Sequence, residues 1–190
     1  MGLDILVITD NFEDFPADYE NEENGYSKIH SLSRTFCDFM CRRVVIEHEP
    51  ELDQIGILTG VDIYPFYDME AYPDEEGLEF FLETAESEEE RLQILAEAEA
   101  DKEKVSGNID LIIDTLDALT NRLSAIDSLP GLLLDTDIDT LNNAVYFSDF
   151  TIDKGEGYTG NNFGQDLRNF KRFLEYAKST GATTVWFTYN

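Results

Sequence analysis

The feature that most constrains this chain is a concentration of carboxylates between Glu47 and Asp101. This stretch holds nineteen Asp and Glu residues and a single basic residue, Arg91. Carboxylates at this density repel one another, and an unpaired carboxylate is very costly to bury. The fold must therefore place most of the stretch at the surface, and electrostatics constrains the function more than any motif does.

The whole chain carries more negative charge than solubility requires. Among 190 residues, 41 acids outweigh 13 bases, which gives a formal net charge of −28 at pH 7. Three explanations compete: adaptation to high salt, a face for a basic partner, and a partner that normally binds nucleic acid. Residues 154–190 carry five bases and three acids, whereas salt adaptation would acidify the whole surface. The uneven charge favours a face directed at a partner, and phosphate repulsion disfavours direct nucleic-acid binding.

Composition indicates a folded protein that occupies one domain over residues 1–190. Hydrophobic residues make up 42% of the chain, with thirteen Phe and nine Tyr, whereas disordered acidic chains are poor in aromatics. No apolar run approaches the length of a membrane span, and the first residues lack a basic leader. We therefore expect a cytoplasmic protein without membrane contact. In that reducing compartment we expect Cys37 and Cys41 to be buried thiols and not a disulfide.

The predicted fold class is α+β, with a mixed or antiparallel sheet of three to four strands covered by helices. Residues 3–9, 144–152 and 183–189 are rich in β-branched and aromatic residues, which favour strands. Residues 61–67 alternate enough to be a fourth strand, with Pro65 at an edge position.

Helical periodicity appears in five segments: 27–43, 76–85, 87–105, 109–127 and 163–179. Apolar residues recur in them every three or four positions. Ser87 followed by Glu90 matches a capping box at a helix start. We expect the helices at 87–105 and 109–127 to form an antiparallel hairpin, within an acidic helical insertion that spans residues 74–127.

No motif predicts catalysis, and we expect no catalytic residue, no metal and no cofactor. Residues with the chemistry of zinc ligands are His30, Cys37, Cys41 and His48. Their spacing is not that of a structural zinc site, so buried thiols are preferred. Residues 135–139 resemble the start of a calcium loop but lack its later glycine and acid. The glycines of 154–162 have dinucleotide-loop spacing, but the expected helix starts several residues later, which favours a plain connection.

The two ends of the chain carry one resemblance. Met1-Gly2-Leu3-Asp4 is followed by a strand and a helix with a histidine, and the chain closes with a strand, a helix and an aromatic strand. This arrangement is similar to small acidic proteins of phages and prophages that begin Met-Gly-Leu-Asp. The resemblance implies a phage-related origin, leaves the acidic middle unmatched and transfers no functional residue.

The expected function is a non-enzymatic acidic interaction protein, an inhibitor of phage type that occupies the basic, nucleic-acid-binding surface of a host protein. Tyrosines interleaved with carboxylates suit such a surface, because Tyr supplies contact area while acids steer a basic partner; the competing interpretation places some of these rings in the core. The expected partner-binding residues are Asp62, Asp68, Glu70, Asp74, Glu75, Glu79, Glu83, Glu86, Glu89, Asp110, Asp114, Asp117, Tyr67 and Tyr72.

Other functions remain open from the sequence. One is an immunity protein that neutralises a basic nuclease toxin through the same kind of surface. Another is a hydrolase that uses clustered carboxylates with a divalent cation, which predicts acids gathered in a concave pocket. A third is a regulatory domain whose charge only maintains solubility, and a homodimer is also left open.

Overall fold

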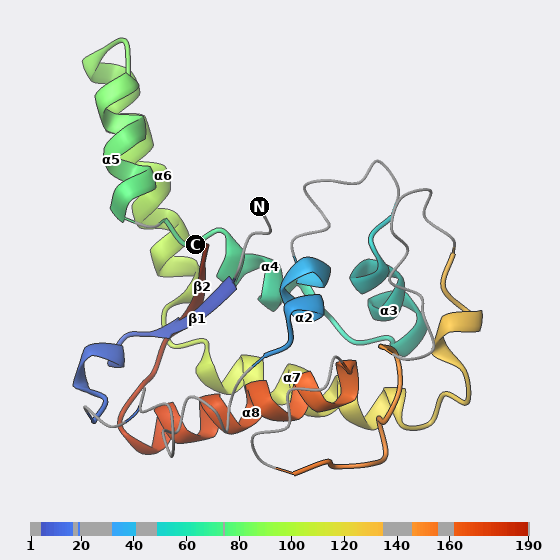
Figure 1. Cartoon of the computed structure of the whole chain (residues 1–190). Helices are drawn as coiled ribbons and strands as arrows, with labels where there is room; N and C mark the ends of the chain where they lie inside the picture. Colours follow the sequence, from blue (N-terminus) through green and yellow to red (C-terminus); the bar gives the residue numbers. More distant parts are fainter. Residues whose placement is uncertain are drawn as a thin grey trace.

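The computed structural model describes residues 5–16, 19, 32–40, 49–73, 75–134, 146–155 and 162–189. Helices dominate these residues and one small sheet accompanies them, so the α+β class is confirmed in coarse form (Figure 1). The elements in chain order are β1 (Ile5–Thr9), η1 (Phe12–Asp14), α2 (Arg34–Met40), α3 (Glu51–Thr59), α4 (Tyr64–Glu70), α5 (Glu75–Thr84), α6 (Glu88–Val105), α7 (Ile109–Leu123), η3 (Leu129–Gly131), α8 (Phe163–Ser179) and β2 (Val185–Tyr189).

The sheet of the described residues contains two strands and not the predicted three to four. β1 and β2 pair antiparallel, with Ile5 opposite Tyr189 and Thr9 opposite Val185. Both strands were expected; β2 begins two residues later than predicted, and residues 3 and 4 of the first predicted strand lie outside the described residues. Ile5, Val185 and Phe187 are buried on the inner face of the sheet, so the strands join the two ends of the chain over the core.

The strand predicted at 61–67 is wrong, because this segment leads into helix α4. Pro65 lies in the first turn of that helix, where a missing backbone N–H removes no helical hydrogen bond. The Asp62 carboxylate accepts a hydrogen bond from the Tyr64 backbone N–H at 3.1 Å, as acids before a helix commonly do. Proline therefore marks a helix start here and not a sheet edge.

The strand predicted at 144–152 is also wrong in its described part, residues 146–152, which form turns. Asp149 has φ +60°, a left-handed conformation that interrupts an extended strand. The Arg168 guanidinium donates to the carbonyl oxygens of Asp149 at 3.0 Å and Phe150 at 2.5 Å. A side chain from α8 thus occupies acceptors that a neighbouring strand would use, and this loop is tied to a helix.

Helix α8 is the central element of the body, and its predicted bounds are confirmed. Its apolar face packs on the sheet and on α2, with the Phe170 ring 5.8 Å from that of Phe187 and 6.0 Å from that of Phe36 between centroids. Of the helix predicted at 27–43, residues 32–40 are described, and residues 34–40 of them form α2. The Cys37 thiol is buried there, whereas Cys41 and both histidines lie outside the described residues.

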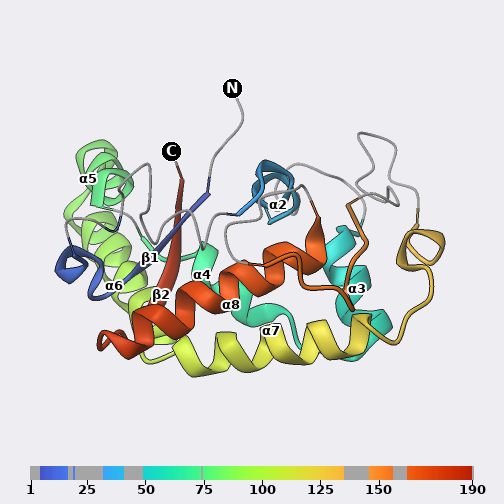
Figure 2. The same ribbon diagram turned by 60° about the horizontal axis from the view of Figure 1, so that its bottom comes forward.

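The helices expected at 87–105 and 109–127 both form, but their predicted pairing as a hairpin is wrong. α7 runs alongside α8 in both views (Figures 1 and 2), and α5 and α6 make the hairpin that projects from the body. The Ser87 cap is confirmed, because the Glu90 N–H donates to Ser87 Oγ at 3.1 Å. The Glu90 carboxylate reaches back one residue beyond the cap and accepts from the Glu86 N–H at 2.7 Å. Local helix signals were correct, and the tertiary partners were not.

Gly164 permits the close contact between α8 and the loop at residues 146–155. A Cβ atom at this position would lie 2.7 Å from the Asp149 carbonyl oxygen, which is backbone and cannot rotate away. We expect Gly164→Ala to lower the free energy of unfolding by about 2–3 kcal/mol, as overpacking does. Urea unfolding followed by circular dichroism measures this change.

Gly131→Ala is the matched control, because its Cβ would meet only the Ser128 hydroxyl, at 3.4 Å. Its unfolding free energy should stay within about 0.5 kcal/mol of the parent value. Equal effects of the two substitutions would contradict the close-contact explanation.

Candidate interaction surface

The projecting hairpin of α5 and α6, residues 75–105, is the most acidic structural unit of the described chain, and we call it the acidic arm. It contains twelve carboxylates and three bases, and its first sixteen residues contain no base. Both helices extend away from the sheet and the α7–α8 layer (Figure 1). Solvent can therefore reach the arm from several sides.

The carboxylates of the arm are exposed. Glu75, Glu79 and Glu83 recur every four residues along α5, which places them on one side of the helix, while Leu78 and Leu82 are half-buried. Like charges at this spacing repel each other. The arm carboxylates that the structure shows exposed are Glu75, Glu79, Glu83, Glu86, Glu88, Glu89, Glu90, Glu97, Glu99 and Glu103.

The three bases of the arm neutralise little of this charge. The Arg91 guanidinium donates to the Leu82 carbonyl at 2.7 Å and so ties α6 to α5. Lys102 lies 3.5 Å from Glu99, and Lys104 pairs at 2.6 Å with Asp68, a predicted partner-binding residue on α4. Two of the three bases are therefore near the root of the arm, and the tip carries unbalanced negative charge.

Several carboxylates on the body are, in contrast, paired with bases of α8. Lys171 contacts both oxygens of Asp117, at 2.6 and 2.7 Å, and this contact raises the pKa of the lysine. Lys178 forms an ion pair with Asp110. Two of the three predicted partner-binding residues on α7 are thus already paired with α8. The third, Asp114, is exposed and forms no such pair.

The loop at residues 146–155 shows the same pattern. Arg172 of α8 contacts Asp153 at 2.5 Å, and this hydrogen bond is the largest cause that lowers the pKa of the Asp153 carboxyl. Lys154 lies 3.1 Å from the Asp149 carboxylate. The bases of the C-terminal third therefore balance carboxylates of the body and leave the arm carboxylates unbalanced.

The predicted tyrosines have structural contacts. Tyr67 is 5% exposed and its hydroxyl donates to the Asp53 carboxylate at 2.6 Å, so this ring belongs to the core and not to a contact surface. Tyr72 stacks on Trp186 of β2 with 4.3 Å between centroids and joins the start of the arm to the sheet. Glu70 is half-buried at the end of α4, and Asp74 lies outside the described residues.

Asp166 is a chemically distinctive residue that the sequence did not single out. It is 2% exposed, and its two carboxylate oxygens accept from the Ser33 backbone N–H at 2.8 Å and from the Ser33 hydroxyl at 2.6 Å. Burial raises its pKa from the ordinary 3.8 to about 6, although the hydrogen bonds from Ser33 oppose the increase. The group joins α8 to the start of α2.

A buried polar stripe on α8 surrounds Asp166. Gln165 accepts from the Lys154 backbone N–H at 2.9 Å and donates to the Gly155 carbonyl at 3.1 Å, while Asn162 caps the helix by accepting from the Gln165 N–H at 3.1 Å. The sequence signal was the spacing of three and four residues between Asn162, Gln165, Asp166 and Asn169. These polar side chains hold the loop at residues 146–155 and the start of α2 against α8, and this structural role explains why they are buried.

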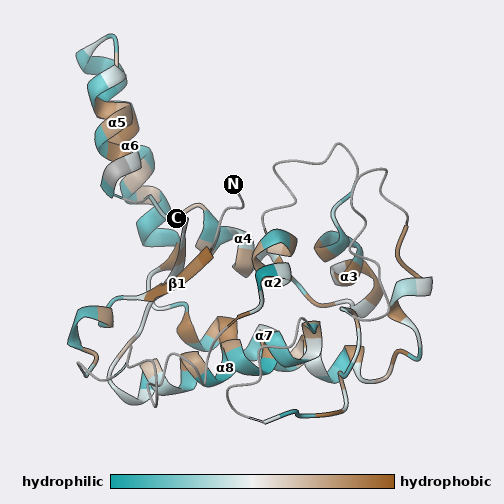
Figure 3. Cartoon of the chain, viewed as in Figure 1, coloured by the Kyte–Doolittle hydropathy of each residue, from teal (hydrophilic) through white to brown (hydrophobic). Residues whose placement is uncertain are grey.

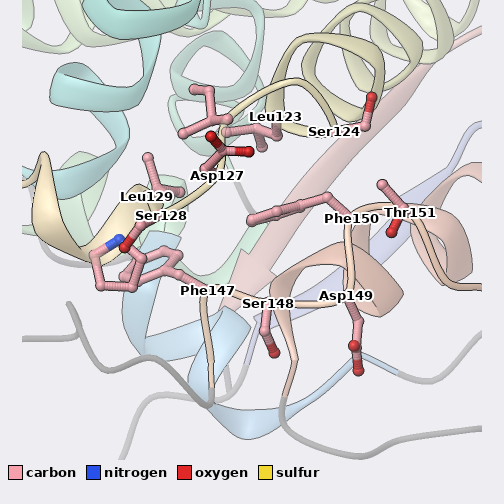
Figure 4. A pocket seen from close by; sticks show the side chains of 12 residues that line it. Leu123, Ser124, Asp127, Ser128, Leu129, Phe147, Ser148, Asp149, Phe150 and Thr151 are labelled. Atoms are coloured by element: carbon pink, nitrogen blue, oxygen red, sulfur yellow. The ribbon is translucent and has the colours of Figure 1, made fainter.

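A pocket of about 290 Å³ lies between the end of α7 and the loop at residues 146–155 (Figure 4). Its walls include Leu123, Leu129, Phe147 and Phe150, and the Asp127 carboxylate is placed among them. Among the described residues, no group of three or more His, Cys, Asp or Glu side chains could hold a metal ion. The residues of the EF-hand-like stretch lie outside the described part.

Comparisons with protein-family models, with curated proteins and with solved structures find no match for this chain. Within the described residues, no helix combines the length and apolarity that a membrane crossing requires.

Asp166 should make stability depend on pH in a direction opposite to that of an ion-paired carboxylate. Its pKa is higher in the folded state than in the unfolded state, so its stabilising contribution is present below about pH 4 and is lost as the pH rises through about 6. Between pH 4 and 7 we expect the unfolding free energy of the parent to fall by about 3 kcal/mol more than that of Asp166→Asn. Urea unfolding at a series of pH values measures both curves.

The comparison with Asp166→Asn removes the effect of the remaining carboxylates, which titrate in both proteins. If the unfolding free energies of the parent and of Asp166→Asn change in parallel with pH, Asp166 has the same pKa in the folded and the unfolded chain. That result would contradict its burial in the core.

Proposed function

We propose that this chain is a non-enzymatic interaction protein that uses the acidic arm to occupy a basic, nucleic-acid-binding surface of another protein. The observation that carries the proposal is the contrast between the arm and the body. Among the described residues, the exposed carboxylates of residues 75–97 form no ion pair with a base, whereas Asp110, Asp117 and Asp153 are paired within the chain. A field of one sign on a projecting unit attracts and orients a partner of opposite sign.

Apolar side chains on the arm support a protein partner over a role in solubility alone. Phe80 and Phe81 are 60% and 58% exposed, and their rings lie 5.9 Å apart between centroids. Leu92 on α6 is also exposed, and both helices of the arm carry apolar positions among polar ones (Figure 3). Aromatic residues beside charge are enriched at protein interfaces, whereas a surface built for solubility would leave them out.

The exposed arm bears differently on two alternative functions, the immunity protein and the carboxylate-dependent hydrolase. An immunity protein that neutralises a basic nuclease would use the same exposed arm, so the structure favours neither partner over the other. The carboxylate-dependent hydrolase called for acids gathered with a divalent cation in a concave site. The acids of the arm lie on projecting helices instead, and no group of three or more His, Cys, Asp or Glu side chains of the described residues could hold a metal ion (Figure 1). The interaction proposal is therefore preferred.

Displacement of nucleic acid tests the proposal. Purified nucleases and DNA-binding domains with a strongly basic surface are first bound to a fluorescein-labelled DNA duplex, and the chain is then added while anisotropy is recorded. We expect the chain to release the duplex from at least one of them. The apparent affinity should fall steeply between about 50 and 200 mM salt, because the Debye length shortens over this range and screens exposed charges. Replacing Glu79, Glu83 and Glu86 by Gln should weaken displacement about tenfold at low salt.

The matched control removes the same number of charges away from the arm. Glu13→Gln, Asp14→Asn and Asp127→Asn change exposed positions of the body and should together change displacement less than threefold (about 0.6 kcal/mol). An equal loss in both triple variants would show that net charge alone acts. No displacement from any basic protein, or displacement that salt does not weaken, would contradict the proposal.

A further inference from the structure

A second surface feature lies at the corner between α3 and α4; α3 lies at the opposite end of the body from the arm in both views, and α4 leads back toward the arm (Figures 1 and 2). It is a groove of about 310 Å³. Its apolar lining comes from Gly56, Ile57, Val61, Ile63 and Tyr64, and its acidic lining from Glu49, Asp53 and Asp62. Apolar and acidic side chains thus meet in one depression.

The shape of the groove follows from close packing at Gly56. A Cβ atom there would lie 3.0 Å from Ile63 Cγ1 and 3.3 Å from the Val61 carbonyl oxygen, so glycine lets the chain after α3 fold back against the helix. Gly60 ends α3 with φ +68°, a conformation that favours glycine. Ile63 is buried by this turn, whereas Ile57 is 70% and Tyr64 57% exposed.

Among the described residues, no base forms an ion pair with Glu49, Asp53 or Asp62. Asp53 accepts from the Tyr67 hydroxyl and Asp62 from the Tyr64 backbone N–H. Carboxylates that line a partly apolar depression complement a ligand with a cationic end and an apolar stem.

We infer that this groove binds an arginine side chain of a basic partner protein. Ile57 and Ile63 would contact the aliphatic stem, since long basic side chains cover apolar surface while their charged end stays polar. The guanidinium would meet Asp53 and Asp62, because its planar donors suit carboxylates, and it would lie near the ring of Tyr64. This inference rests on the proposed function for the identity of the partner, but the groove itself is tested without one.

The first experiment uses a small probe on the whole chain. Nα-acetyl-arginine amide and Nα-acetyl-citrulline amide, which has nearly the same shape but no charge, are titrated separately at equal ionic strength while ¹H–¹⁵N spectra are recorded. We expect saturable shifts of the amide signals of Gly56, Ile57, Asp62 and Ile63 with the arginine probe and none with citrulline. Equal shifts with both probes, or arginine shifts that leave these four signals unchanged, would overturn the inference.

Variants assign the effect to the groove. Asp62→Asn removes a charge and keeps a side-chain oxygen that can accept from the Tyr64 backbone N–H, so the fold is retained. Ile57→Ser removes exposed apolar surface. Each should lower the affinity for the arginine probe about threefold to tenfold, while Asp14→Asn, an equal loss of charge at an exposed position of η1, should not change it. Equal affinities in Asp62→Asn and Asp14→Asn would overturn the inference.

The two proposals can fail separately. If basic proteins are captured through the arm but the groove signals ignore the arginine probe, the groove inference fails and the proposed function stands. If the groove binds the arginine probe but the chain binds no basic protein, the arginine site in the groove stands and the proposed function fails.

Discussion

Mutual repulsion among carboxylates is the constraint on which this structure depends. With 41 acids and 13 bases, the chain cannot neutralise every acid, so the position of each base decides where negative charge remains. α8 directs Lys171, Lys178 and Arg172 to carboxylates of α7 and of the neighbouring loop. Each exposed pair contributes little stability by itself, but together they relieve repulsion within the part of the molecule that holds the core.

The acidic arm lies outside that arrangement. Of its described side chains, only Ala98 and Val105 are buried, and both belong to α6. Helices of this length need packing or capping to persist, and the arm relies on the Ser87 cap and on the Arg91 contact with Leu82. A unit with few buried contacts opens locally at low cost, so contact with a basic partner would both neutralise the arm and stabilise its helices.

Sequence reasoning succeeded where the signal was local. The bounds of α8, the Ser87 cap and the two terminal strands follow from periodicity, cap chemistry and β-propensity within a few residues. It failed where the decisive contact is distant: alternation at 61–67 was outweighed by Pro65 in a helical first turn, and the loop at 146–152 was set by Arg168. The paired state of Asp110 and Asp117, and the burial of Asp166 against Ser33, also depend on contacts across the fold that spacing does not reveal.

The central claim is that unbalanced negative charge is concentrated on the arm. Paramagnetic relaxation of backbone amides by a cationic and an anionic nitroxide of equal size measures the local potential directly, residue by residue. At the amides of residues 75–99, the cationic nitroxide should enhance relaxation clearly more than the anionic one, and along α7 and α8 this difference should be much smaller. Equal ratios over the arm and the body would contradict it.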